Sequence, residues 1–200
     1  MKLTSFLSAC AVTVSVATPA FAQSTASEGQ RDINQQQRIE QGLKSGALTT
    51  QEAARLEGEE ARVEKMQSNA LRDGKLTPEE KARIGQAQNK VSQDIYREKH
   101  DAQRGDPNSA SSQRMQADVQ RNVNQQQRIE QGIRSGQLTN KEAGNLEGGQ
   151  SRVSRTESRA GADGNVGAKE QRRIQNSENK QSKHVYREKH DGQKRASHKQ

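Results

Sequence analysis

Cysteine and aromatic residues are nearly absent from this sequence. Its 200 residues include one Cys, no Trp, two Phe and two Tyr. Cys10 and both Phe residues lie within residues 1–22, which have the features of a secretory signal: Lys2, a mostly apolar run, and the small-x-small site Ala20-Phe21-Ala22. A chain cleaved there has no cysteine, which excludes a disulfide scaffold, a thiolate metal site and a cysteine nucleophile.

The signal predicts a periplasmic or secreted protein with no transmembrane segment after cleavage. Leu7-Ser8-Ala9-Cys10 also spells a bacterial lipobox, but too few residues precede it to form the basic and apolar regions that a signal needs. We therefore expect cleavage after Ala22 rather than acylation of Cys10.

Large apolar side chains are also scarce. From residue 23 onward, Leu, Ile, Val and Phe make up 21 of 178 residues, about 12%, below the roughly 20% at which disorder becomes common. The formal net charge of +8 comes from 33 basic and 25 acidic side chains, so the charge density is low. The chain meets only one of the two conditions for disorder, and a fold with a thin core is expected.

The sequence does contain a tandem duplication. Residues 33–103 match residues 123–193 at a constant offset of 90, with 37 of 71 positions identical. Apolar residues recur at three- and four-residue spacing, which predicts helices at about 32–44, 50–72 and 78–103 in the first copy. Four turns contain a Gly suited to positive φ, and three of them continue into a capping box: Thr49/Glu52, Thr77/Glu80 and Thr139/Glu142.

The predicted fold is all-α, with two tandem copies of an up-down-up three-helix unit joined by a flexible linker. Copy two replaces Leu71 by Gly161 and adds helix-weakening glycines such as Gly144 and Gly149, so it is expected to be the looser copy and partly disordered when isolated. The predicted boundaries are a signal peptide at 1–22, a flexible leader at 23–31, copy one at 32–103, a linker at 104–118, copy two at 119–193 and a basic tail at 194–200.

The turn from Asn69 to Glu80 resembles the calcium loop of an EF-hand. Asp73 holds the fifth position, Gly74 the sixth and Glu80 the twelfth, but Leu71 at the third has no side-chain oxygen. Weak calcium binding through Asp73 and Glu80 is one interpretation. The other is that these residues end one helix and start the next.

Two blocks are identical in the two copies: 34–42 with 124–132, and 96–101 with 186–191. Because neighbouring positions changed, these blocks are candidates for a surface that contacts a partner. The candidate residues are Arg38, Glu40, Tyr96, Arg97, Lys99, His100, Arg128, Glu130, Tyr186, Arg187, Lys189 and His190. His100 and His190 precede aspartates, but adjacent residues do not share a helix face, so a solvated helix end is favoured over a metal site there.

No motif for a nucleophile, a phosphate loop or a metal-activated water is present, so the chain is predicted not to be an enzyme and to need no cofactor. A non-catalytic interaction or structural role is favoured, with an unidentified protein or envelope component as partner. Weak calcium binding and electrostatic binding of anionic lipid or polysaccharide are the alternatives. Nucleic acid is disfavoured because acids alternate with bases and aromatics are few. With its repeated helix-turn-helix units, the chain resembles exported repeat proteins of unassigned function from Gram-negative bacteria.

Overall fold

A computed structural model describes residues 20–192. All regular secondary structure in that range is helical, which confirms the all-α class. The predicted signal peptide up to residue 19 and the predicted basic tail lie outside the described residues. The helices are α1 (Ala20–Ser45), α2 (Thr50–Ala70), the short 3-10 helix η1 (Leu71–Asp73), α3 (Pro78–Lys99), α4 (Ala110–Arg134), α5 (Asn140–Ala160) and α6 (Ala168–His190).

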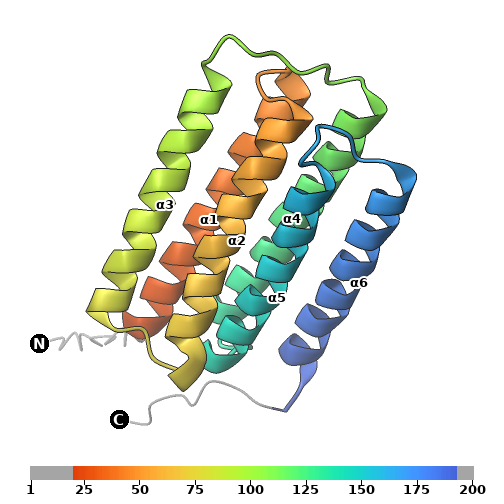
Figure 1. The fold of residues 1–200 in the computed structure, drawn as a ribbon. Helices are drawn as coiled ribbons and strands as arrows, with labels where there is room; N and C mark the ends of the chain where they lie inside the picture. Colours follow the sequence, from red (N-terminus) through yellow and green to blue (C-terminus); the bar gives the residue numbers. More distant parts are fainter. Residues whose placement is uncertain (1–19, 193–200) are drawn as a thin grey trace, which may run out of the picture.

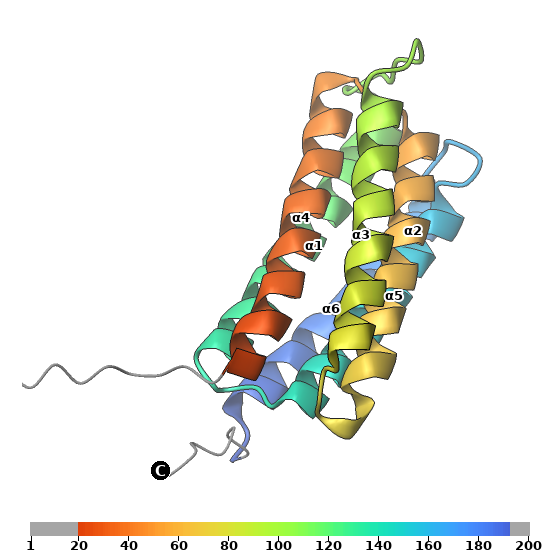
Figure 2. The same cartoon turned by 90° about the vertical axis from the view of Figure 1, so that its left-hand side faces the viewer.

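The six helices lie side by side, and each runs opposite to the one before it (Figure 1). At the centre, α2 packs along α5 and α1 packs along α4. α3 lies against α1 and α2 on one side of this centre (Figure 2), and α6 lies against α4 and α5 on the other. Side chains between the four central helices therefore form the interior, whereas α3 and α6 supply much of the surface. Within the described range, no helix is long and apolar enough to cross a membrane.

Capping residues set where the helices begin. The capping boxes predicted at Thr49, Thr77 and Thr139 are all formed: each Thr side chain accepts from the backbone N–H of the Glu three places on. α6 starts instead at Gly167, which supplies no side-chain cap. The turns use the left-handed backbone region that only Gly enters at little cost, with φ between 70° and 84° at Gly46, Gly74, Gly136 and Gly164.

Residues 23–31 are helical, so the prediction of a flexible leader is wrong. They extend α1 because this stretch has something to pack against: Ala26 is 3% exposed and Glu28 is 6% exposed. The Gln88 side chain of α3 also donates to the backbone carbonyl of Glu28 at 3.0 Å. Contacts with a distant segment override the low hydrophobicity of the stretch.

The connection between α3 and α4 is shorter than the predicted linker at 104–118. Ser109 caps α4 by accepting a backbone N–H of its first turn at 3.2 Å, and Met115 is fully buried. The backbone N–H of Gly105 donates to the carbonyl of Gly46 at 3.0 Å, which ties the connection to the turn after α1. The polar composition predicted a linker, but more than half of the predicted residues, 110–118, belong to the packed helix α4.

The core consists of the apolar residues that the helical spacing singled out. Every Leu, Ile and Val between residues 33 and 95 is at most 7% exposed. The second half contributes Met115, Ile129, Ile133, Leu138, Leu146, Val166, Ile174 and Val185 to the same cluster. All three helices of that half are formed and packed, so its looseness in isolation stays a prediction.

α2 and α5 approach each other through small residues. A Cβ added at Gly58 would lie 2.6 Å from Ser158 Oγ, and a Cβ added at Gly148 would lie 2.7 Å from Ser68 Oγ. Gly58 and Gly148 are 90 residues apart, and so are Ser68 and Ser158. The two contacts are therefore reciprocal, as in a self-complementary interface.

Two glycines that were expected to weaken the second half also face the first half. A Cβ at Gly144 would lie 2.7 Å from the Cβ of Leu71, and a Cβ at Gly161 would lie 2.8 Å from the Cβ of Ala54. Such distances are shorter than van der Waals contact between carbon atoms. These glycines therefore make room for α2 and η1, which offsets their low helix propensity.

Candidate functional site

Acidic and basic side chains are separated on α5. Its three acids, Glu142, Glu147 and Glu157, are at most 5% exposed. Arg152, Arg155 and Arg159 are exposed on the opposite side. This helix therefore presents cations to solvent with few carboxylates to balance them.

These three arginines line a groove of about 800 Å³ between α5 and α6. Six Arg or Lys residues and one His line it, and no Asp or Glu of the described chain does so. Charges of one sign along a concave surface raise the local concentration of oppositely charged ligands. The charged residues are Arg152, Arg155, Arg159, Arg173, Lys180, His184 and Arg187.

A second hollow of about 540 Å³ borders α6 and shares Lys180 and Arg187 with the groove. It is also lined by Arg128, Lys183 and Tyr186. Tyr186 is 58% exposed. The cationic surface therefore continues around α6 and includes one exposed aromatic ring.

The corresponding surface between α2 and α3 is neutralised. Lys90 Nζ lies 2.5 Å from Asp94 Oδ2 and 3.9 Å from Glu59 Oε2, and Arg97 pairs with the same aspartate. Burial alone would raise the pKa of Asp94, but the hydrogen bond from Lys90 and its positive charge hold that pKa below its usual value. The positions 90 residues later hold Gly149 and His184, so both acids are missing from the α5–α6 groove.

Three of the twelve predicted surface residues, Arg128, Tyr186 and Arg187, line the hollow beside α6. Several of the twelve, Arg128 included, hold helices together. Arg38 donates to the backbone carbonyl of Ser92 at 3.0 Å, and Arg128 donates to Ser182 Oγ at 2.9 Å. Glu40 pairs with Lys44, and Glu130 pairs with Arg134. Lys99 donates to the Arg38 carbonyl, and Lys189 donates to the Gln131 side chain. The ring of Tyr96 stacks on His100, and the ring of Tyr186 stacks on His190.

The identical block at 34–42 and 124–132 is explained in part by this packing. Gln35 donates to the Gln88 carbonyl at 2.6 Å, and Gln125, 90 residues later, donates to the Glu178 carbonyl at 3.1 Å. Both bonds connect the first helix of a half to its third. These glutamines are retained for structural reasons and supply no free contact surface.

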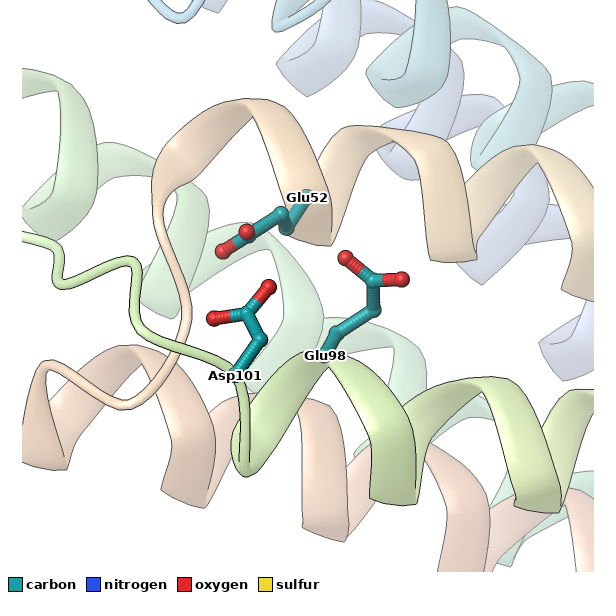
Figure 3. A group of neighbouring side chains, drawn as sticks. All are labelled: Glu52, Glu98 and Asp101. Atoms are coloured by element: carbon teal, nitrogen blue, oxygen red, sulfur yellow. The ribbon is translucent and has the colours of Figure 1, made fainter.

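The block at 96–101 contributes to a cluster of carboxylates. Glu98 of α3 and Asp101 just after it lie beside Glu52 at the start of α2 (Figure 3). One oxygen from each lies within 4.8 Å of the other two. The same arrangement recurs 90 residues later with Glu142, Glu188 and Asp191. We call these two clusters the first and second acid triads.

Sequence reasoning missed the triads. It considered Asp101 with its neighbour His100, but the His100 ring stacks on Tyr96 instead, with ring centroids 4.1 Å apart. A signal was present, because Glu98 and Asp101 lie in an unaltered block. Glu52 recurs as Glu142 in a capping box, which explains its retention without any site.

The residues of the EF-hand-like turn act as caps. Asp73 Oδ1 accepts from the Lys75 backbone N–H at 2.9 Å, and Glu80 Oε2 accepts from the Thr77 backbone N–H at 3.0 Å. Neither residue belongs to an acid triad. Calcium binding by Asp73 and Glu80 stays a prediction.

The interior between the central helices contains several acids that are at most 4% exposed, among them Asp32, Glu57, Glu60, Glu64, Glu147 and Glu157. Amide side chains donate hydrogen bonds to several of these carboxyls. Gln36 Nε2 donates to Glu57 Oε2 at 3.1 Å, and Gln126 Nε2 donates to Glu147 Oε2 at 3.0 Å, again 90 residues apart. Both oxygens of Glu60 lack a partner within the described part of the chain.

At one pair of equivalent positions, the carboxyl and the amide are on opposite helices in the two halves. Gln67 donates to Asp32 Oδ2 at 2.6 Å, whereas 90 residues later Asn122 donates to Glu157 Oε2 at 2.6 Å. Each half therefore keeps one carboxyl and one amide at this place. A hydrogen-bonded pair is retained even where its members trade positions.

Burial raises the pKa of these interior carboxyls, because an ionised group loses its hydration there. The pKa rises to about 7 for Asp32 and Glu57 and to about 8 for Glu147. For Glu60 and Glu64, burial and then neighbouring carboxylates raise the pKa well above its usual value. Asp32, Glu57 and Glu147 are therefore mostly protonated in mildly acidic solution.

No protein-family model, curated protein or solved structure matches this chain.

Proposed function

We propose that this protein is a non-catalytic binder of anionic polymers and that the α5–α6 groove is its binding surface. The observation that carries the proposal is the set of six Arg and Lys residues lining a groove of about 800 Å³ without an acid among its described lining residues. Polymers that bear repeated phosphate, sulfate or carboxylate groups complement such a surface. Arg in particular binds these planar or tetrahedral anions through paired N–H groups.

The chain is further proposed to be two tandem copies of a three-helix unit, packed against each other through α1, α2, α4 and α5. The 90-residue offset in the sequence and the reciprocal Gly58–Ser158 and Gly148–Ser68 contacts support this architecture. Under this proposal the copies share a framework and differ in their outer grooves. Within the described chain, only the second copy has the cationic groove, because Gly149 and His184 stand where the first copy has Glu59 and Asp94.

The interior acids strengthen the same proposal. They are turned away from solvent, and below the raised pKa values of Asp32, Glu57 and Glu147 these side chains carry no charge. The surface of the protein is therefore more positive than the formal net charge of +8 indicates. Attraction of a polyanion should grow as the pH falls through this range.

Since the sequence predicts a secretory signal, the proposed partner belongs to the periplasm or the outside of the cell. Lipopolysaccharide and acidic polysaccharide carry the repeated anionic groups that the groove would attract. Binding should weaken steeply with salt, because screening acts on exposed charges over about 10 Å at 0.1 M ionic strength. A partner bound mainly through apolar contacts would instead leave the affinity nearly independent of salt.

Heparin and lipopolysaccharide are suitable probes, with affinity measured between 50 and 300 mM salt. The test variant is Arg152→Gln/Arg155→Gln/Arg173→Gln, which removes three charges from the groove. Its matched control removes the three charges at the corresponding positions of the other half: Arg62→Gln, Lys65→Gln and Arg83→Gln.

We expect the test variant to lose at least about tenfold in affinity and to show a shallower salt dependence, while the control loses far less. Equal losses in the two variants would mean that binding follows net charge and not the groove. Stronger binding to duplex DNA than to either polysaccharide would overturn the choice of partner.

A further inference from the structure

We propose that each acid triad is a binding site for a divalent cation, one formed by Glu52, Glu98 and Asp101 and the other by Glu142, Glu188 and Asp191. This inference is independent of the polyanion groove, since it concerns the opposite charge and different residues. It is also distinct from the EF-hand-like turn.

The geometry of the first triad suits a cation. Its three carboxylates come from the first turn of α2, the last turn of α3 and the residue shortly after α3, and they lie close together (Figure 3). Their oxygens lie within 4.8 Å of one another, and a central ion at about 2.3–2.6 Å from each, the distance of calcium–oxygen bonds, spans that separation.

The second observation is a buried carboxylate oxygen with no partner. Glu52 is 5% exposed, and its Oε2 accepts from the backbone N–H and the hydroxyl of Thr49 at 2.8 and 2.9 Å. These bonds fix the carboxylate, while Oε1 is buried and has no hydrogen-bond partner among the described residues. An unsatisfied buried acceptor is costly, and a metal ion at the triad satisfies it.

The same feature is present in the second triad. Glu142 is 5% exposed, its Oε2 is held by Thr139, and Oε1 again lacks a partner within residues 20–192. A capping box needs only one carboxylate oxygen. The other oxygen is therefore free to act as a ligand in both halves.

Two guanidinium groups compete with an ion for Glu98 of the first triad. Arg55 pairs with Glu98, Arg97 Nε lies 3.8 Å from the same carboxylate, and Asp101 accepts from the backbone N–H of Gln103 at 2.8 Å. Arg55 and Arg97 project to solvent, with side chains more than half exposed. A cavity of about 510 Å³ lined by Glu52, Arg55 and Gln103 adjoins the site.

The two triads differ in their neighbours. Asn145 stands where the first half has Arg55, so no guanidinium at that position competes for the second triad. Instead His184 Nε2 lies 3.1 Å from Glu188 Oε1. Asp191 is exposed, whereas its counterpart Asp101 is half-buried.

The ligand chemistry selects the class of metal. All the donors are carboxylate oxygens, without nitrogen or sulfur, and such sites prefer the hard cations Ca²⁺, Mg²⁺ and Mn²⁺. Three protein ligands leave room for waters in the coordination shell. We therefore expect modest affinity and two ions per chain.

Titration calorimetry of the full chain with Ca²⁺ and Mn²⁺ tests the inference, and spin relaxation of bound Mn²⁺ locates the ions. The wild-type chain should bind two ions. Glu98→Gln/Asp101→Asn should abolish the first site, Glu188→Gln/Asp191→Asn the second, and the four substitutions together should abolish both. Circular dichroism checks that every variant keeps its helices.

Two further variants sharpen the result. Asp73→Asn/Glu80→Gln should leave both sites intact, because these residues lie outside the triads. Arg55→Asn should tighten the first site roughly two- to fivefold, since it removes a competing cation. Absence of binding by the wild-type chain, unchanged stoichiometry in the triad variants, or a loss confined to Asp73→Asn/Glu80→Gln would each overturn the proposal.

Discussion

The helices α1–α3 and α4–α6 follow the same plan, yet they place their acids differently. In the first half, Glu59 and Asp94 neutralise cations at the surface, while Glu60 and Glu64 extend into the interior. At the positions 90 residues later, the second half has Gly149, His184, Gln150 and Ser154. The apolar framework was kept in both halves, whereas charge was redistributed. The second half therefore has the more cationic groove, and the first half supplies more of the buried acid.

This asymmetry predicts a strong dependence of stability on pH. The interior carboxyls have a higher pKa in the folded chain than in the unfolded chain, so the folded state binds more protons. Their contribution is complete below about pH 4.5 and is lost as the pH rises through about 7 to 8. Ionising Glu147 alone, whose pKa rises from 4.5 to about 8, costs about 5 kcal/mol.

Urea unfolding at pH 5 and pH 8.5 measures this effect. The free energy of unfolding should fall by several kcal/mol at the higher pH, a large part of the total stability of a domain of this size. Asp94 works in the opposite direction, since its lowered pKa makes stability fall only when the solution becomes acidic enough to protonate it. Equal stability at the two pH values would show that the interior carboxyls are hydrated and ionise normally.

A single interior substitution should reproduce part of the contrast between the halves. Glu60→Gln introduces the residue found at position 150 and removes a fully buried carboxyl whose two oxygens lack described partners. Stability should rise by roughly 1–3 kcal/mol at pH 8.5 and change little at pH 5, because the carboxyl is already neutral there. Chemical denaturation at both pH values checks this, and a loss of stability at pH 8.5 would contradict it.

The role of the second-half glycines can be tested by whether an alanine substitution raises or lowers the stability of the protein. Gly144→Ala should destabilise the protein by roughly 1–3 kcal/mol although Ala is the better helix former, because the added Cβ would lie 2.7 Å from the Cβ of Leu71. Gly85→Ala on α3 is the control. Its Cβ would meet only Arg31 Nη1 at 3.9 Å, and it should stabilise by roughly 0.5–1 kcal/mol. Thermal unfolding distinguishes the two outcomes, and stabilisation by both would mean that the glycines only weaken the helix.

Local features of this fold could be predicted from the sequence, because each depends on residues close together in the chain. The capping boxes at Thr49, Thr77 and Thr139 and the left-handed turn glycines are of this kind. The helical spacing of Leu, Ile and Val likewise identified the core. Periodicity along one helix, however, contains no information about which other helix will lie against it.

The features that were missed are contacts between distant segments. Considered within α5 alone, Gly144 lowers helix propensity. In the fold it leaves the space that the Leu71 side chain occupies. Glu52 is a cap in its own turn, and only the fold brings Glu98 and Asp101 to it. The burial of Glu60 was hidden for the same reason, since a Glu on an apparently polar face gives no sign that a second three-helix unit covers that face.

The smallest expected effect tests the difference between the grooves most directly. His184→Asp introduces the first-half residue into the α5–α6 groove, where its carboxylate would pair with Lys180 and Arg187, as Asp94 pairs with Lys90 and Arg97. Heparin affinity should fall roughly two- to fivefold, in line with the strength of exposed ion pairs. The reciprocal Asp94→His frees two cations on the α2–α3 side and should raise affinity by a similar factor. The two substitutions change the charge at equivalent positions in opposite directions, so they should change the affinity of a ligand bound by charge in opposite directions. If both lower the affinity, the halves do not differ in the way proposed.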